Sequence, residues 1–98
     1  MDAQAAIHRL SGAKESLQAL GLQHISLFGS TARGEAGAAS DVDLAVTLDD
    51  GAKIDLFRFA AISEQVSRLL GARVDLVVEP SRNPRIQAQI NRDRLHVF

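Results

Sequence analysis

Hydrophobic residues recur every three or four positions over the first 20 residues of the chain, which is the spacing of one face of a helix. The apolar positions of this face are Ala6, Ile7, Leu10, Ala13, Leu17 and Leu20. Gly21 follows directly, and glycine often ends a helix because it adopts the left-handed conformation without steric cost. The pattern therefore predicts one amphipathic helix over residues 3–20, with one face packed against the rest of the protein.

Four later segments have the composition or the alternation of strands. The run HISLFG, residues 24–29, is short, rich in apolar residues and ended by glycine, as expected for a buried strand. In DVDLAVTL, residues 41–48, the side chains alternate with period two, which predicts a strand with two different faces. RVDLVVE, residues 73–79, alternates in the same way. LHVF, residues 95–98, predicts a short last strand.

Helices are predicted between these strands. Asp55 is a suitable N-cap for a helix that ends at Gly71. The apolar stripe of that helix consists of Phe59, Ile62, Val66 and Leu69. A last helix is predicted from Asn83 onward, because an N-cap residue followed by Pro84 is typical of a helix start. Since helices alternate with strands, the sequence predicts an α/β fold, a small mixed sheet with flanking helices, in a single domain over residues 1–98.

Composition narrows the class of protein. Of the 98 residues, 46% are hydrophobic and 23% are charged, and the net charge is -1, which is the balance of a soluble globular domain rather than of a uniformly basic nucleic-acid-binding protein. The last quarter is locally rich in arginine, at Arg73, Arg82, Arg85, Arg92 and Arg94. We interpret these arginines as a solvated helix face rather than as a phosphate-binding patch. Without cysteine, a signal-like N-terminus or an apolar run of about 20 residues, we expect a cytoplasmic protein that has no disulfides and does not enter a membrane.

Asp41 and Asp43 are the first candidates for chemistry. Two positions apart on a strand, their side chains project from the same face, roughly 6.6 Å apart along the chain. At an effective dielectric constant near 20 their repulsion is about 2 kcal/mol, and burial adds a desolvation cost. Mg²⁺ would compensate this charge, because it takes oxygen ligands and is commonly held by one or two carboxylates plus substrate phosphates. Asp75, in the same phase on a later strand, would supply a third carboxylate if the strands are neighbours, as suits a two-metal phosphoryl-transfer site.

A candidate phosphate site lies upstream of these carboxylates. Gly29 and Ser30 stand where the first strand ends, so that free backbone N–H groups and a hydroxyl group could receive the β- and γ-phosphates of a nucleotide. Arg33 would either orient the turn through an ion pair or contact phosphate directly, and both interpretations stay open. The three histidines, His8, His24 and His96, have no metal-like spacing to the aspartates and are interpreted as ordinary surface or packing residues.

The segment GSTARGEAGAASDVDLAV, residues 29–46, closely resembles the nucleotidyltransferase signature of the DNA polymerase β-like superfamily, in which a G-S motif ending a strand is followed by D-x-D on the next strand. The chain also resembles the minimal nucleotidyltransferases in its short length, in the ARG that follows GS and in the SD that opens the D-x-D motif. Proteins of that group are often the antitoxins of two-gene toxin–antitoxin modules. RVDLVV matches the later strand of the family that carries the third carboxylate.

The resemblance implies a polymerase β-like nucleotidyltransferase fold and a role for each motif residue. Gly29 and Ser30 would bind the triphosphate of the nucleotide, with ATP as the donor. Asp41 and Asp43 would hold two Mg²⁺ ions, and Asp75 would complete the site and take a proton from the acceptor hydroxyl. The hydroxyl would attack the α-phosphate, pyrophosphate would leave, and a nucleoside monophosphate would remain on the acceptor.

The acceptor is expected to be a macromolecule, because the chain has none of the added substrate domains of larger family members. The family points to an α-helical toxin of the HEPN type, adenylylated on tyrosine, and the chain has no tyrosine of its own to be modified instead. Two alternatives stay open: an antitoxin that neutralises its partner by occlusion alone, and a nucleotidyltransferase acting on RNA or on a small molecule. Self-association through the exposed faces of the first and last helices also stays open.

Overall fold

One mixed sheet of four strands organises the molecule. The computed structural model describes residues 1–37, 40–51 and 53–98. The strands are β1 (Leu22–Phe28), β2 (Val42–Leu48), β3 (Val74–Val78) and β4 (Leu95–His96), in the sheet order β3-β2-β1-β4. β1 runs antiparallel to both of its neighbours, β2 and β4, whereas β2 and β3 are parallel. This arrangement confirms the predicted α/β fold with a small mixed sheet, and the predicted strands differ from the observed ones mainly at their ends.

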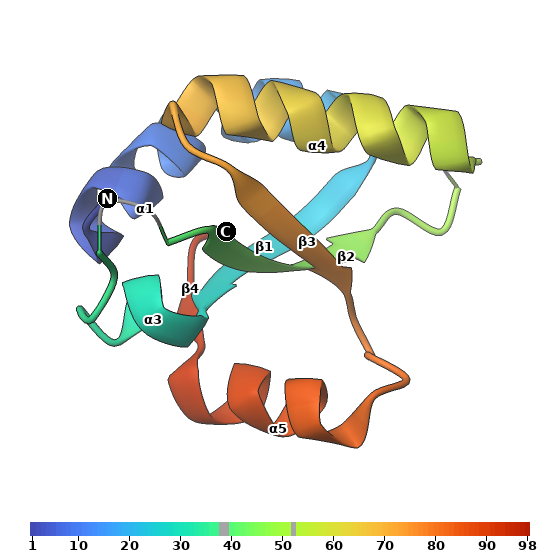
Figure 1. Cartoon of the computed structure of the whole chain (residues 1–98). Helices are drawn as coiled ribbons and strands as arrows, with labels where there is room; N and C mark the ends of the chain where they lie inside the picture. The colour runs from blue at the N-terminus through green and yellow to red at the C-terminus, as the bar shows by residue number, and fades with distance from the viewer. Residues whose placement is uncertain (38–39, 52) are drawn as a thin grey trace.

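Helices cover both faces of the sheet. They are α1 (Ala3–Gly12), α2 (Lys14–Ala19), α3 (Gly29–Ala32), α4 (Leu56–Leu70) and α5 (Pro84–Asp93). Figure 1 shows α4 with the N-terminal helices on one side of the sheet and α5 on the other. The predicted caps are confirmed, since the side chain of Asp55 accepts a hydrogen bond from the Arg58 N–H and Gly71 is left-handed with φ 64°. Among the described residues, no helix is both long enough and apolar enough to span a membrane.

The single N-terminal helix predicted over residues 3–20 is wrong, because the structure breaks it at Ala13. Ala13 has φ −107° and ψ 14°, outside helical geometry, and its N–H donates to the Leu10 carbonyl, only three residues earlier, at 3.1 Å. Gly12 immediately precedes the break, and glycine has a lower helix propensity than every residue except proline. The apolar spacing still serves both helices, because Leu10 of α1 and Leu17 of α2 are both fully buried.

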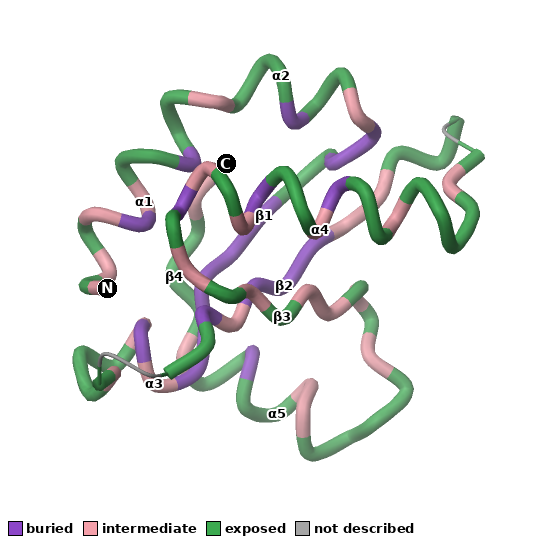
Figure 2. The backbone as a smooth tube through the Cα atoms, turned by 45° about the horizontal axis from the view of Figure 1, so that its top comes forward, coloured by how far each residue is buried: buried purple, intermediate pink, exposed green. Residues whose placement is uncertain are grey.

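Two apolar clusters, one on each face of the sheet, hold these layers together. The larger joins α1, α2 and α4 to the strands, and its buried members are Ala6, Leu10, Leu17, Leu22, Ile25, Leu27, Val42, Leu44, Val46, Ile62, Val66, Leu70 and Phe98. The smaller lies beneath α5 and consists of Phe28, Ala45 and Ile90, with Val77 and Ile86 partly buried against it. Figure 2 shows the buried positions concentrated on β1 and β2, the two central strands.

The alternation along β2 therefore places core residues on one face of the strand and the candidate site residue Asp43 on the other. Val42, Leu44 and Val46 enter the larger cluster. Asp43 and Ala45 project from the opposite face, which α5 covers only in part. The parallel pairing with β3 aligns Asp43 with Asp75. The two strands that the sequence singled out for carboxylates are thus neighbours in the sheet.

Candidate active site

Asp43 lies at the centre of the candidate site. The register of the sheet places it beside Phe28 of β1 on one side and Asp75 of β3 on the other. Partial burial raises the pKa of the Asp43 carboxyl, and the negative charges of Asp75 and Asp41 raise it further, while the positive charge of Arg33 partly opposes them. Negative charge is thus concentrated at one end of β2, where a cation or cationic ligand would be favoured.

Asp41 and Asp75 flank this central carboxylate and are more exposed. Asp41 immediately precedes β2, and its Oδ1 atom lies 3.2 Å from Nε of Arg73, so that this carboxylate already has a cationic partner. Asp75 is exposed on β3. The structure therefore brings all three predicted carboxylates to one end of the β2 and β3 pair.

The backbone of Gly29 lies close to the side chain of Asp43. A Cβ atom at this position would lie 2.3 Å from Oδ2 of Asp43, and the backbone has φ +75°, which side chains other than glycine rarely adopt. Glycine is therefore required here both by its conformation and by the space that the carboxylate occupies. Ser30 follows in the single turn of α3 and is half-buried. The G-S motif and the D-x-D motif consequently meet in space.

Arg33 ends α3 and forms ion pairs with two carboxylates. Its Nε donates to Oε2 of Glu35 at 2.9 Å, and its Nη1 donates to Oδ2 of Asp93 at 2.7 Å. The ion pair that the sequence left as one of two interpretations is therefore present. Asp93, in α5, was missed by the sequence analysis because no motif marks it and 60 residues separate it from Arg33.

The donor set of this site suits Mg²⁺ in its chemistry, because every candidate ligand is a carboxylate oxygen and Mg²⁺ needs only one or two of them when substrate phosphates supply the rest. The pKa of Asp43 is raised first by burial and then by the negative charges of Asp75 and Asp41, and a bound cation would offset that negative charge. Within the part of the chain that the structure describes, however, no three histidine, cysteine, aspartate or glutamate side chains are arranged as a ready-made metal site. A metal ion here would depend on phosphate oxygens and on movement of the carboxylates.

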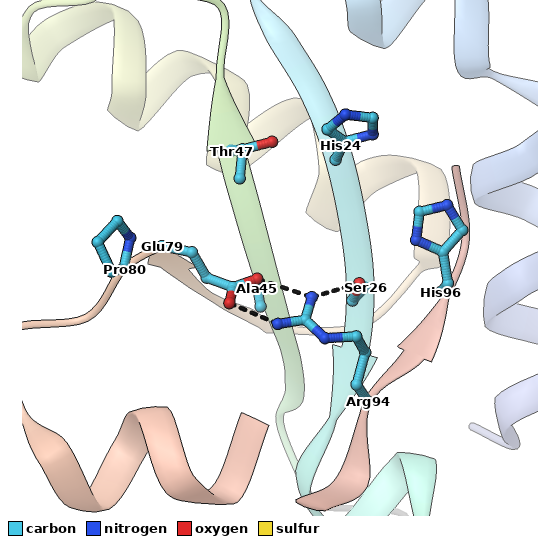
Figure 3. A pocket seen from close by; sticks show the side chains of 8 residues that line it. All are labelled: His24, Ser26, Ala45, Thr47, Glu79, Pro80, Arg94 and His96. Carbon is cyan, nitrogen blue, oxygen red and sulfur yellow. Dashed lines mark hydrogen bonds and ion pairs between the residues drawn. The ribbon is translucent and has the colours of Figure 1, made fainter. Parts of the chain in front are cut away.

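A separate hollow of about 440 Å³ lies farther along the same sheet face and contains none of the three aspartates. It begins at Ala45, two residues beyond Asp43, and its lining residues are His24, Ser26, Ala45, Thr47, Glu79, Pro80, Arg94 and His96. Figure 3 shows Arg94 reaching across it to Glu79 and Ser26. The rings of His24 and His96 lie 6.1 Å apart, a proximity that their separation in sequence concealed. Because the guanidinium group of Arg94 is paired with the Glu79 carboxylate, this hollow has little net positive charge to attract phosphate, and we place the chemistry at the aspartates instead.

Comparison with known protein families and with proteins of known sequence gives a consistent result. The family model described as nucleotidyltransferase domain matches residues 10–96. A protein adenylyltransferase, MntA, from Thermococcus cleftensis is 37% identical over 84 residues, which cover 86% of this chain and 83% of that protein.

Solved structures agree with the fold. A minimal nucleotidyltransferase of known structure is 33% identical and superimposes with a TM-score of 0.69, covering 97% of this chain and 95% of that one. A Shewanella oneidensis complex of a tri-AMPylated HEPN toxin with its MNT antitoxin contains a chain that is 21% identical, with a TM-score of 0.65 and coverage of 94% and 71%. A toxin–antitoxin structure with AMP-PNP is 24% identical, with a TM-score of 0.70 and coverage of 90% and 72%. At these last two identities the likeness demonstrates the shared fold alone.

Proposed function

Because this chain belongs to the nucleotidyltransferase domain family and is a nucleotidyltransferase, we propose that it transfers AMP from ATP to a hydroxyl group of a partner protein. The observation that carries the proposal is the position of Asp43. It is paired with Asp75 in the sheet, and its carboxylate lies close to the backbone of Gly29. The name of the Thermococcus relative, protein adenylyltransferase, supports a protein as the acceptor.

The partner in this proposal is an α-helical HEPN-type toxin, and its modification makes this chain an antitoxin. The Shewanella complex supports the assignment, since it pairs an MNT antitoxin of the same fold with a HEPN toxin that carries AMP groups. The acceptor hydroxyl belongs to a tyrosine of the toxin, while this chain has no tyrosine.

Each residue of the site has a role in this proposal. Gly29 and Ser30 bind the triphosphate through backbone N–H groups and the serine hydroxyl, and Arg33 adds positive charge nearby. The metal-holding residues are Asp41, Asp43 and Asp75. Mg²⁺, as two ions, would neutralise the charge that develops on the phosphate oxygens. The negative charges of Asp75 and Asp41 near the partly buried Asp43 are the reason that a cation would bind there.

The reaction forms one phosphorus–oxygen bond and breaks another. The acceptor oxygen attacks the α-phosphorus of ATP, the bond from that phosphorus to the bridging oxygen of the β-phosphate breaks, and pyrophosphate leaves with the electron pair. Asp75, the more exposed carboxylate on β3, accepts the proton of the acceptor hydroxyl. Catalysis consists mainly of positioning and charge neutralisation, so a small chain can perform it.

The pairing of arginines supports a protein acceptor over RNA. Three of the five arginines of the basic segment that would attract nucleic acid each have a carboxylate partner: Arg73 pairs with Asp41, Arg92 with Asp93 and Arg94 with Glu79. Paired cations contribute less to the counterion release that drives binding to phosphate backbones.

A transfer assay tests the proposal. The purified protein is mixed with Mg²⁺, ATP labelled on the α-phosphate and a HEPN-type protein as the acceptor, and each protein is examined for label. Label on the partner that requires Mg²⁺ and is lost with Asp43→Asn supports the proposal. Absence of label on the partner, in a mixture where the two proteins form a tight complex, contradicts it.

A second candidate function is neutralisation by occlusion alone. It is favoured by the ion pair between Asp41 and Arg73, which occupies one of the three carboxylates. Cells that express the partner toxin distinguish the two functions, because an Asp43→Asn variant that still protects them acts by occlusion and one that fails to protect them acts by transfer.

A further inference from the structure

The short helix α3 depends on its neighbours for its position. It comprises four residues, Gly29–Ala32, and has no side-chain hydrogen bond at its N-cap. A single helical turn is not stable alone in water, because nucleating a helix costs more than one turn recovers. Tertiary contacts must therefore hold Ser30 of the proposed nucleotide site in place. Arg33, the C-cap residue of α3, supplies a charged contact to α5.

Asp93 receives that contact from a nearly buried position. Only 5% of its side-chain surface is exposed. It accepts from Nη1 of Arg33 at 2.7 Å, and from Nε and Nη2 of Arg92 at 2.9 Å and 3.1 Å. Hydrogen bonds between ionised partners are stronger than neutral ones, and a covered carboxylate that loses its partners is costly to keep charged. Asp93 is thus bound on two sides by guanidinium groups.

The helix that carries Asp93 is itself fixed to the strands of the site. Ile90 of α5 is fully buried and packs with Phe28 and Ala45. Phe28 directly precedes Gly29, and Ala45 is two residues beyond Asp43 on β2. Immediately after α5, Arg94 donates to Ser26 of β1 at 2.9 Å and forms an ion pair with Glu79. The position of Asp93 is therefore fixed relative to both β1 and β2.

We propose that Asp93 is a positioning residue of the nucleotide site, which holds Arg33 against α5 and thereby fixes α3 and Ser30 relative to Asp43. Its effect on nucleotide binding rests on the proposed function, whereas its effect on α3 does not. Asp93 itself contacts no substrate in this account and acts through Arg33. The role belongs to no sequence motif and arises only because α5 packs beneath the end of β1.

Two variants of the full chain test the proposal. Asp93→Asn keeps the shape of the side chain but removes its charge. Arg92→Ala is the matched control, since it removes the other guanidinium partner, whose side chain is 63% exposed, and leaves the contact from Arg33 to Asp93 intact. Asp93→Asn should raise KM for ATP by about tenfold, the equivalent of one charge-assisted hydrogen bond, with kcat nearly unchanged. It should also speed hydrogen exchange of the backbone amides of residues 30–34, whereas Arg92→Ala should change neither quantity.

Unchanged KM and unchanged amide exchange in Asp93→Asn, or equal effects of the two variants, would overturn the positioning role. Asp93→Glu is the second variant should Asp93→Asn fail to fold. It keeps the charge and displaces the carboxylate by one methylene, and it should show a smaller change in the same direction. A wild-type chain that neither binds nor transfers ATP contradicts the proposed function instead, and the amide exchange comparison still decides whether Asp93 holds α3.

Discussion

Asp43 and Asp75 occupy directly paired positions on the parallel strands β2 and β3. Adjacent strands lie about 4.8 Å apart, which is closer than the spacing of two same-face residues along one strand. The sheet therefore creates a like-charge pair between two distant segments of the chain. In agreement, Asp75 contributes more than Asp41 to the raised pKa of Asp43, although burial contributes most. Such a pair favours a bound cation.

Replacing Asp43 with asparagine should abolish nucleotide transfer without destabilising the protein, because the change removes a repelled, partly buried charge and keeps the side-chain shape. Thermal unfolding of Asp43→Asn without ligands should occur at a temperature equal to or higher than that of the wild type. Mg²⁺ with ATP should raise the unfolding temperature of the wild type but not that of the variant. Asp49→Asn is the control, since Asp49 is exposed and, among the described residues, its side chain accepts a hydrogen bond only from the nearby Gly51 N–H. Normal transfer by Asp43→Asn would show that the chemistry lies elsewhere.

Alanine at Gly29 should impair transfer, whereas alanine at Gly34 should not. Both glycines have φ +75°, but an added Cβ has no neighbour within 4 Å at Gly34 and would lie 2.3 Å from Asp43 Oδ2 at Gly29. We expect Gly34→Ala to lower the free energy of unfolding by about 1 kcal/mol, from backbone strain alone. Gly29→Ala should cost more and should also reduce transfer by about 100-fold by displacing the carboxylate. Urea unfolding and single-turnover transfer rates of both variants measure these effects, and equal stabilities would exclude the clash.

The parts of this structure that depend on local pattern could be predicted from the sequence. The period-two alternation of β2 correctly separated Val42, Leu44 and Val46, which are buried, from Asp43 on the opposite face. The N-cap of α4 at Asp55 was equally visible, because the hydrogen bond it accepts comes from Arg58, three residues away. In each case the residues that interact are neighbours in the chain.

Contacts between distant segments could not be predicted in the same way. The sequence indicated a third carboxylate at Asp75 only on the condition that its strand lies beside β2, and the strand order supplies that condition. Nothing in the local pattern indicates that Asp93 meets Arg33, because this contact requires α5 to pack beneath the end of β1. The proximity of His24 and His96 likewise follows from the pairing of β1 with β4.

The ion pairs of Asp93 should make stability depend on pH below about 4. The hydrogen bonds from Arg92 and Arg33 lower the pKa of Asp93 from 3.8 to about 2. A carboxylate with a lowered pKa in the folded state binds fewer protons there than in the unfolded chain, so its contribution to stability is fully present above about pH 4 and is lost as the pH falls toward 2. Asp93→Asn should remove this part of the acid dependence while leaving that of other carboxylates, such as Glu79, in place. Urea unfolding of both proteins between pH 5 and pH 2 measures the difference, and parallel stability curves would contradict the assignment.

Alanine substitutions at Gly12 and Gly71 should change stability in opposite directions. Gly12 is the last residue of α1, its φ is not positive, and an added Cβ has no neighbour within 4 Å. Alanine there should raise the free energy of unfolding by about 0.5–1 kcal/mol, because it restricts the unfolded chain and favours helix. Gly71 ends α4 with φ +64°, where alanine should cost about 1 kcal/mol. Chemical denaturation of the two variants gives both values. A destabilised Gly12→Ala would mean that the break between α1 and α2 requires glycine, rather than merely tolerating it.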